Sequence, residues 1–217
     1  NLSMIKKLFA ILLIGLSFSS CQAQSKKNQT NRAVSLLAPK GKAVAAFAEG
    51  CFWCSEHIYE SVAGIDSAIA GYSGGNTVNP TYEEVCSETT GHAESVLIYY
   101  NPKIISYKEL IKVFFTSHDP TTLNRQGPDE GSSYRSVIFY QNETEKMLAK
   151  QALSDLTLRG AFKRPIVTEL LPLKTFWRAE EYHQDFIKKN PNQPYVKGVS
   201  MPRFEQFKKS YKPSKSK

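Results

Sequence analysis

Residues 43–60 read AVAAFAEGCFWCSEHIYE, an apolar run that passes through a glycine into a pair of cysteines. The apolar residues 43–50 predict a buried strand. Residues 51–60 are predicted to follow directly as a helix. Cys51 therefore stands where a strand turns into a helix, and the free N–H groups of a first helical turn favour negative charge there.

The two cysteines of this stretch, Cys51 and Cys54, have the spacing C-x-x-C. One helical turn separates them, so both thiols lie on one face, within reach of a disulfide bond after a modest adjustment. The start of the helix is expected to lower the pKa of Cys51, and the thiolate that results is a nucleophile. Gly50 permits the tight turn between the strand and the helix. A zinc site would need a second ligand pair, which Cys86 and His92 do not supply. Two buried core residues and a thioredoxin-like redox pair both remain possible from the motif alone.

The rest of the chain alternates apolar runs with amphipathic stretches, a pattern typical of a sheet covered by helices. Further strands are predicted at residues 68–72, 95–100, 135–140 and 165–171. Helices are predicted at residues 107–116, 144–159 and 179–189, with Gly160 as a left-handed cap after the second. No repeat or linker divides this region, so residues 43–207 are predicted to form one α+β domain.

Composition and charge exclude two broad classes of protein. The chain has 217 residues, of which 41% are hydrophobic and 22% charged, so disorder of the whole chain is excluded. Its net charge of +8 would suit a nucleic-acid binder, but residues 49–205 hold all twenty acidic residues beside sixteen basic ones. The body is therefore mildly acidic, the excess positive charge lies in the flanks, and we expect no nucleic-acid binding.

The first 21 residues have the order of a secretory signal. Met4 is followed by Lys6 and Lys7, then by the apolar residues 8–18, then by Ser-Ser-Cys ending at Cys21. The apolar run is shorter than the roughly 20 residues of a membrane span. Because its end resembles a bacterial lipoprotein cleavage site, we expect an exported, periplasmic or cell-envelope protein, lipid-anchored at Cys21. An ordinary cleaved signal with an incidental cysteine is the alternative.

Two polar segments flank the predicted domain. Residues 22–42 lack a hydrophobic period and are predicted to form a flexible tether. Residues 208–217, where lysine and serine alternate around a proline, are predicted to form a basic disordered tail.

Several longer motifs follow one another in a fixed order. They are GCFWCSE at residues 50–56, GYSGG at 71–75, NPTYEEVCSETTGHAE at 79–94, YNPKIISYKELIKVFF at 100–115, HDPTTLNRQGPDEGSSYRSVIFY at 118–140 and AEEYHQDFIKKNPNQPY at 179–195. From about residue 44 to residue 207 the chain thereby resembles the A-type peptide methionine sulfoxide reductases. The expected fold is an α+β two-layer sandwich in which helices pack on a mixed, ferredoxin-like sheet.

The resemblance implies a peptide-methionine (S)-S-oxide reductase, which reduces the S epimer of methionine sulfoxide, free or in proteins, and so repairs oxidised exported proteins. It implies no bound metal or organic cofactor, and a thioredoxin-like protein as the electron donor. We expect a monomer. The alternative function is a lipid-anchored, thioredoxin-like thiol-disulfide oxidoreductase, which would use the same C-x-x-C pair.

By the same resemblance, individual residues are assigned to the steps of the reaction. Cys51 is the expected nucleophile that attacks the sulfoxide sulfur. Glu94 is the expected acid that protonates the oxygen, which at neutral pH requires a pKa raised by burial. Tyr82 and Tyr134 are the phenols expected to bind the same oxygen while staying neutral. Asp129 is expected to organise the hydrogen bonds of the site.

The resemblance also assigns the methyl pocket. Phe52 and Trp53 match the aromatic pair that receives the methyl group of the substrate. Ser133 stands where family members commonly have glutamine, so the hydrogen bonds on the oxygen side are expected to differ in detail. The four histidines are expected to be structural, namely His57, His92, His118 and His183.

The recycling step departs from the commonest family pattern. Many members carry a second cysteine just after the tyrosine that corresponds to Tyr195, but this chain has Val196 there and no cysteine beyond Cys86. Cys54 is therefore predicted to condense with the sulfenic acid on Cys51, because a sulfenic acid reacts with a nearby thiol. Cys86 is predicted to be a bystander.

Overall fold

The computed structural model describes residues 32–214. The predictions for residues 1–21, including the lipid-anchored Cys21, fall outside the described residues. Within residues 32–214, the helices are all too short or too polar to cross a membrane.

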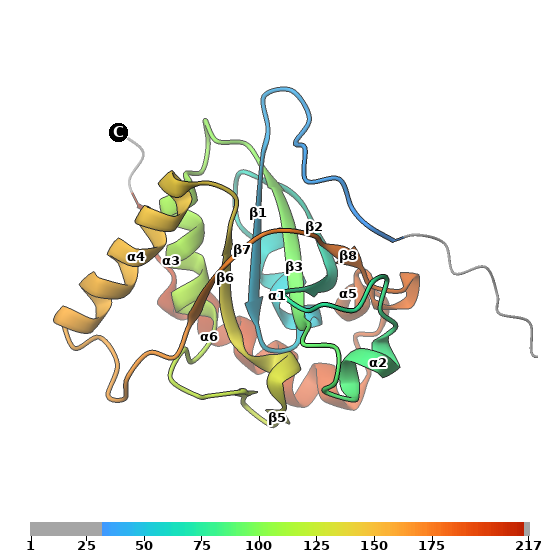
Figure 1. Cartoon of the computed structure of the whole chain (residues 1–217). Helices are drawn as coiled ribbons and strands as arrows, with labels where there is room; N and C mark the ends of the chain where they lie inside the picture. Colours follow the sequence, from blue (N-terminus) through green and yellow to red (C-terminus); the bar gives the residue numbers. More distant parts are fainter. Residues whose placement is uncertain (1–31, 215–217) are drawn as a thin grey trace, which may run out of the picture. The chain divides into compact units, whose positions relative to one another are not determined.

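A six-stranded sheet in the order β7-β6-β1-β3-β2-β8 forms the centre of the fold (Figure 1). Its strands are β1 (Ala43–Glu49), β2 (Ile65–Ser73), β3 (Ala93–Tyr100), β6 (Ser136–Tyr140), β7 (Glu169–Pro172) and β8 (Trp177–Arg178). Neighbouring strands are antiparallel, except that β6 and β7 are parallel. The sheet is therefore mixed, and its central order β6-β1-β3-β2 is ferredoxin-like, which confirms the predicted fold class.

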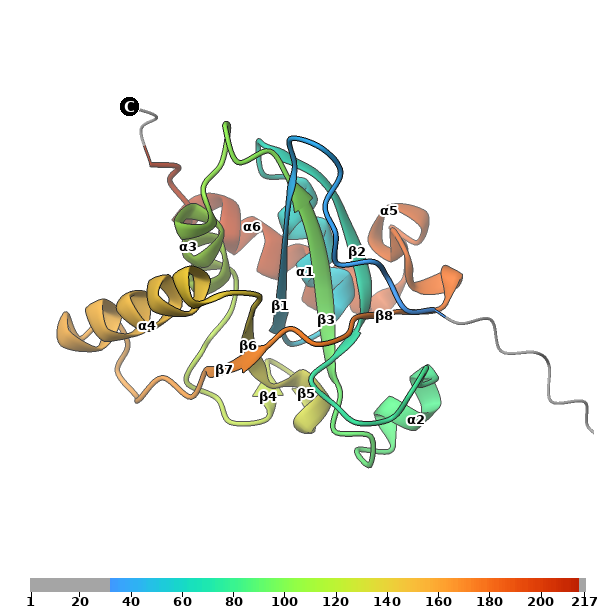
Figure 2. The same ribbon diagram turned by 45° about the horizontal axis from the view of Figure 1, so that its top comes forward.

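Helices cover one face of this sheet. They are α1 (Phe52–Glu60), α3 (Tyr107–Ser117), α4 (Glu143–Leu158) and α6 (Met201–Ser210). In Figure 2, α1 and α6 lie behind the strands, α3 and α4 lie to their left, and the chain between β7 and β8 crosses in front of the strands. The helix predicted at residues 144–159 is confirmed within one residue at each end, and Gly160 after it has the expected left-handed φ of +59°.

Shorter elements join these. They are α2 (Tyr82–Cys86), the hairpin of β4 (Arg125–Gln126) and β5 (Asp129–Glu130), the 3₁₀ turns η1 (Ser132–Tyr134) and η2 (Glu181–His183), α5 (Phe186–Lys189) and the π-helical turn η3 (Val196–Ser200). Sequence analysis predicted no helix over residues 196–210, where η3 leads directly into α6.

Strand β1 is buried on both faces because its side chains alternate between two hydrophobic clusters. Ala45 and Phe47 belong to the larger cluster beneath the helices. Val44 and Ala46 belong to a smaller cluster on the opposite face, which also contains Phe176. Phe176 belongs to the chain between β7 and β8, which crosses in front of β1 in Figure 1. Burial on both sides explains why this strand is a continuous apolar run, which anchors the turn into α1.

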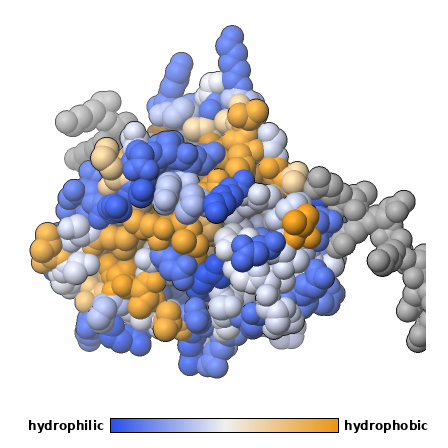
Figure 3. Space-filling model, in the orientation of Figure 1, coloured by the Kyte–Doolittle hydropathy of each residue, from blue (hydrophilic) through white to orange (hydrophobic). Residues whose placement is uncertain are grey.

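The chain between β7 and β8 crosses one face of the sheet, and the molecular surface on that side is mixed in polarity. Polar and apolar residues are interspersed there, and apolar surface gathers between α4 and the chain that leads into β7 (Figure 3). Leu156, Phe162 and Ile166 line a cavity of about 110 Å³ in that region.

The predicted tether at residues 22–42 is wrong for its described part. Ala33 forms a β-bridge with Trp177, and the Val34 N–H donates to the Phe176 carbonyl at 2.9 Å. Val34 and Leu36 also pack on the smaller hydrophobic cluster. This segment is ordered because it covers apolar sheet surface that β1 would otherwise expose.

The predicted disordered tail at residues 208–217 also begins too early. Helix α6 continues to Ser210, and the ring of Tyr211 stacks on Phe207 with a centroid distance of 5.0 Å. The Tyr211 hydroxyl donates to Glu109 of α3 at 2.9 Å. Contacts with α3, which lies about a hundred residues earlier in the sequence, order this part of the chain.

Two predicted elements are shorter than expected. The strand predicted at residues 165–171 begins only at Glu169, because the Val167 N–H donates to the Pro120 carbonyl and not to a strand. The helix predicted at residues 179–189 is interrupted after His183. There the side chain of Gln184 pairs with both the N–H and the carbonyl of Ala70, at 3.1 and 3.0 Å, so this segment closes the edge of β2.

Candidate active site

The nucleophile predicted from sequence lies at the start of α1, as expected. Cys51 is the residue before the first helical turn, with φ −51° and ψ 121°, and its side chain is buried. Gly50 has a φ of +87°, and a Cβ placed on it would lie 2.5 Å from the Cβ of Gln126. Glycine is required at this position for both its conformation and its lack of a side chain.

The two thiols of the pair have opposite pKa shifts. Burial, the hydrogen bond with Cys54 and the negative charges nearby raise the pKa of Cys51 well above its ordinary value. The same hydrogen bond, followed by the charge of Arg203 and a contact with Ser200, lowers the pKa of Cys54 to about 6 against the effect of burial. Burial thus opposes the effect of the helix start on Cys51, and the hydrogen bond between the two thiols favours the negative charge on Cys54 in the reduced pair.

Glu94 on β3 is fully enclosed next to this pair. Its Oε2 accepts a hydrogen bond from the Phe52 N–H at 3.0 Å, in the first turn of α1. Burial, together with the charge of Asp129, raises the pKa of Glu94 to about 8. A carboxyl with this pKa carries a proton at neutral pH, so Glu94 has the acid form that the sequence prediction requires.

Tyr82 and Tyr134 flank the same space. Burial raises the pKa of each phenol, and the charge of Glu94 raises it further, so both hydroxyls stay protonated. Cys51 also influences both tyrosines, which places the two phenols, the carboxyl and the thiol around one site. The ring of Tyr82 lies parallel to Phe52, with centroids 6.5 Å apart.

The aromatic residues predicted to form the methyl pocket are held by neighbours from the C-terminal segment. Phe52 is fully buried, whereas Trp53 is half-buried and stacks on Phe186 at 3.7 Å between centroids. The indole N–H of Trp53 donates to Nδ1 of His183 at 3.1 Å. Burial lowers the pKa of His183 to about 4, so the ring is neutral and Nδ1 can accept. His183 thus orients Trp53, in line with the structural role expected for it.

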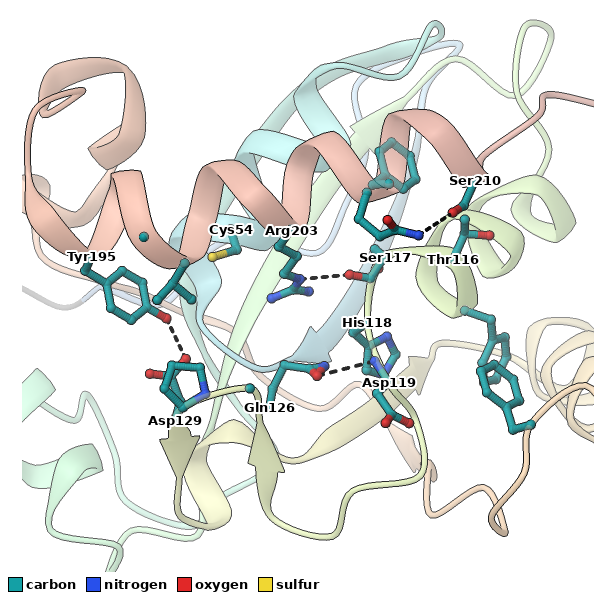
Figure 4. A pocket seen from close by; sticks show the side chains of 18 residues that line it. Cys54, Thr116, Ser117, His118, Asp119, Gln126, Asp129, Tyr195, Arg203 and Ser210 are labelled. Atoms are coloured by element: carbon teal, nitrogen blue, oxygen red, sulfur yellow. Dashed lines mark hydrogen bonds between the residues drawn. The ribbon is translucent and has the colours of Figure 1, made fainter.

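Asp129 on β5 accepts a hydrogen bond from the Tyr195 hydroxyl at 2.5 Å (Figure 4). The Tyr195 hydroxyl also lies next to Cys51 and lowers the pKa of that thiol. Because a phenol has one proton, it donates to either Asp129 or Cys51 at a given moment. Sequence analysis used Tyr195 only as a landmark. Its position at the end of a matched motif was the available signal that it belongs to the site.

A cavity of about 650 Å³ opens beside Cys54, between the end of α3, the β4–β5 hairpin and α6 (Figure 4). Arg203 of α6 lies at its inner wall, where Nε donates to the Ser117 carbonyl at 2.8 Å and Nη2 to the Glu49 carbonyl at 2.9 Å. Sequence analysis missed this arginine, because no motif marks it and α6 was not predicted.

The remaining polar residues lie at the edge of the site. The Ser133 hydroxyl donates to Oε1 of Glu88 at 2.7 Å, so the residue that replaces the family's glutamine binds a neighbouring loop. Cys86 is exposed at the end of α2 and is hydrogen bonded to Tyr82. Within residues 32–214, no three His, Cys, Asp or Glu side chains are grouped in a way that would hold a metal ion.

Comparisons with known proteins point to one family. A family model described as peptide methionine sulfoxide reductase matches residues 43–216. Proteins named peptide methionine sulfoxide reductase MsrA from Saccharolobus solfataricus and Natronomonas pharaonis are 48% and 46% identical, over 77% and 78% of this chain and 94% and 95% of their own length. Mxr1 from Saccharomyces cerevisiae in reduced form is a similar solved structure, with a TM-score of 0.67 and 36% identity over 73% of this chain and 94% of that one. Methionine sulfoxide reductase A of Corynebacterium diphtheriae has a TM-score of 0.64 and 31% identity over 71% and 78%.

Proposed function

The chain belongs to the peptide methionine sulfoxide reductase A family, and from this premise we propose how its side chains divide the reaction. The protein is a peptide-methionine (S)-S-oxide reductase, which converts the S epimer of methionine sulfoxide to methionine. One observation carries the proposed division: a buried thiol pair, a protonated carboxyl and two neutral phenols meet at the start of α1.

The substrate is oriented by its two ends. The methyl group packs against Phe52 and Trp53, whose rings are fixed by stacking and by the hydrogen bond to His183. The sulfoxide oxygen faces Tyr82, Tyr134 and Glu94, which can each donate a hydrogen bond. This arrangement supports epimer selection, because exchanging the oxygen with the methyl group would put a polar atom against rings and leave the donors unpaired.

Oxygen transfer begins when Cys51 attacks the sulfoxide sulfur. The Cys51 proton passes to the Cys54 thiolate along their hydrogen bond, and Glu94 protonates the departing oxygen. The protonated oxygen then moves from the substrate sulfur to the Cys51 sulfur: an oxygen–sulfur bond forms on Cys51, and the substrate sulfur–oxygen bond and the transient sulfur–sulfur bond break. Methionine leaves with the electron pair of that sulfur–sulfur bond, so its sulfur is reduced while Cys51 is oxidised to a sulfenic acid. Asp129 supports this step by holding the Tyr195 hydroxyl beside the Cys51 sulfur.

Recycling then proceeds through Cys54. Its sulfur lies one helical turn from Cys51 and is hydrogen bonded to it, whereas Cys86 is exposed and bound to Tyr82. Condensation of Cys54 with the sulfenic acid forms a disulfide and releases water. A thioredoxin-like dithiol protein is the proposed donor that reduces this bond, since a protein dithiol can supply both electrons by thiol exchange.

Replacing Cys54 with serine is expected to stop thioredoxin-driven turnover while leaving a single round of sulfoxide reduction. Serine keeps a hydrogen-bonding group beside Cys51 but cannot form the disulfide. The measurement is methionine released per enzyme, together with mass spectrometry of the oxidised protein. The matched control, Cys86→Ser, is expected to retain turnover. A trapped bond between Cys51 and Cys86, or undiminished turnover in Cys54→Ser, would show that this assignment is wrong.

We also propose that this reductase is an exported lipoprotein. Support comes from the order of Lys6 and Lys7, the apolar residues 8–18 and the Ser-Ser-Cys end at Cys21. Labelled fatty acid is expected to enter the wild-type protein in a bacterial host and to be absent from Cys21→Ser. Equal labelling of the two proteins, or none in either, would contradict the lipid anchor.

A further inference from the structure

We propose that Arg203 is the positioning residue that keeps the negative charge of the thiol pair on Cys54 and thereby directs the reductant to the Cys51 sulfur. This inference rests on the proposed role of Cys54 as the resolving cysteine, and it adds the direction in which the disulfide is opened. It assigns a function to Arg203, a partly buried arginine whose side chain is 14% exposed.

The guanidinium of Arg203 is held in one orientation by the strand that precedes the nucleophile. Nε donates to the Ser117 carbonyl at 2.8 Å. Nη2 donates to the Glu49 carbonyl at 2.9 Å and to its Oε1 at 3.2 Å. Nη1 lies beside the turn, 3.7 Å from the place a Cβ on Gly50 would occupy. The positive charge is therefore fixed against the residues that carry Cys51.

Cys54 receives two groups from the same stretch of helix. Ser200 and Arg203 are three residues apart, where the π-helical turn η3 passes into α6, so their side chains share one face. The Ser200 hydroxyl is 3.2 Å from the Cys54 sulfur. Figure 4 shows Cys54 between Tyr195 and Arg203 at the wall of the cavity. A hydroxyl in contact with the sulfur and a positive charge nearby both favour its thiolate form.

The groups that face Cys54 from the surrounding elements are mostly acidic. They are Cys51 just before α1, Glu49 of β1, Glu94 of β3, Asp129 of β5, Tyr195 just before η3, and Arg203 of α6. Arg203 is the cation of this group, and burial of the site increases the effect of its charge.

Glu49 competes with Cys54 for that charge. It is fully buried, and its Oε2 accepts a hydrogen bond from the Ser117 hydroxyl at 2.7 Å. Burial raises the pKa of Glu49 to about 7, although Arg203 opposes the rise. His118 lies 3.9 Å away but is neutral, because burial lowers its pKa to about 3. The Arg203 guanidinium therefore stabilises the negative charge of both Glu49 and Cys54. Removing one of these two acids is expected to lower the pKa of the other.

The location of the charge decides how the disulfide forms. Cys54 thiolate attacks the sulfur of the Cys51 sulfenic acid, a sulfur–sulfur bond forms, and the sulfur–oxygen bond breaks. Hydroxide leaves and takes up a proton to give water. Arg203 and Ser200 remain beside Cys54 at this stage and favour its thiolate, which is the attacking form.

The same charge decides how the disulfide is opened. A thiolate of the dithiol reductant attacks the Cys51 sulfur, the sulfur–sulfur bond breaks, and its electron pair leaves with Cys54 beside Arg203. A thiol of lower pKa leaves faster, so this direction is favoured over attack at Cys54. The second thiol of the reductant then displaces Cys51 as a thiolate and becomes oxidised. The intermediate is a mixed disulfide between the reductant and Cys51.

The first test measures the pKa of the Cys54 thiol from the pH dependence of alkylation, located by mass spectrometry. Arg203→Met is expected to raise this pKa by about 1 to 3 units, the effect typical of a close opposite charge. Glu49→Gln is expected to lower it, and Arg203→Lys to restore most of the wild-type value. The double variant Glu49→Gln/Arg203→Met leaves no buried carboxylate without its partner. The pKa of Cys54 in this double variant is expected to be higher than in Glu49→Gln alone. Shifts of opposite sign are not produced by a general loss of packing. The inference is overturned if the Cys54 pKa of Arg203→Met equals that of wild type and that of the double variant equals that of Glu49→Gln.

The second test identifies the attacked sulfur. The oxidised enzyme is mixed with a thioredoxin whose second active-site cysteine is replaced by serine, and the trapped complex is digested. The mixed disulfide is expected at Cys51, and a bond at Cys54 would overturn the proposed direction. If Cys54→Ser kept full turnover, the proposed recycling route would fail on its own, whereas the alkylation result would still report whether Arg203 controls the charge of Cys54.

Discussion

Replacing Cys51 with serine is expected to abolish reduction of methionine (S)-sulfoxide, a loss on the order of a thousandfold or more, as for other removed nucleophiles. A serine hydroxyl at the start of α1 is not ionised at neutral pH and cannot accept the oxygen as a sulfenic acid. The fold is expected to survive, because the exchange of sulfur for oxygen leaves the backbone of the turn unchanged.

The measurement is turnover of separated S and R sulfoxides with dithiothreitol as a small reductant, which bypasses any protein partner. Wild type is expected to reduce the S epimer, and Cys51→Ser neither epimer. Cys86→Ser, a cysteine-to-serine exchange at the exposed end of α2, serves as the matched control and is expected to keep its activity. Activity on the R epimer alone, or activity that survives the loss of Cys51, would overturn the assignment of the nucleophile.

Replacing Glu94 with glutamine is expected to slow oxygen transfer by roughly a hundredfold to ten-thousandfold, the usual contribution of a general acid. The amide oxygen of glutamine can still accept from the Phe52 N–H, which Glu94 binds at 3.0 Å, so the change removes the acidic proton with little loss of structure. The measurement is the rate of methionine formation in a single turnover.

The pH dependence of this step has a definite sign. Burial raises the pKa of Glu94 to about 8, and the protonated form is the active one. The single-turnover rate of wild type is therefore expected to fall as pH rises through about 8, while Glu94→Gln loses this dependence. Glu56→Gln is the matched control, because burial likewise raises the pKa of Glu56 to about 8, but its carboxylate accepts from the Asp185 N–H outside the site. The assignment fails if the control loses activity as strongly as Glu94→Gln, or if the variant keeps the wild-type pH profile.

Periodicity and turn signals were sufficient for the elements whose own residues specify them. The strand ending before Gly50 and the helix after it agree with the prediction within one residue, because the apolar run and the glycine determine both locally. The interrupted helix at residues 179–189 could not be predicted in this way. Its break depends on Gln184 binding the backbone of Ala70, a contact between residues 114 positions apart.

The motifs also identified residues that the fold brings together from distant positions. Cys51 precedes α1, Glu94 is on β3 and Tyr134 is in η1, and the fold brings these three residues together at one site. The motifs contained no signal for Arg203, because a lone arginine among C-terminal lysines has no pattern. Its importance comes from burial next to Cys54, which depends on how α6 packs.

The sequence by itself determined the family, the fold class and the position of the C-x-x-C pair at the turn from strand to helix, because these depend on local residue order. Only the tertiary structure decided which groups surround each sulfur. Local order favoured Cys51, which lies at the helix terminus. In the folded protein, burial raises the pKa of that thiol, while Ser200 and Arg203 reach Cys54 from a helix nearly 150 residues further along the chain. The ionisation of a buried thiol depends on its enclosure and on the charges that surround it, and both arise only when distant segments pack together.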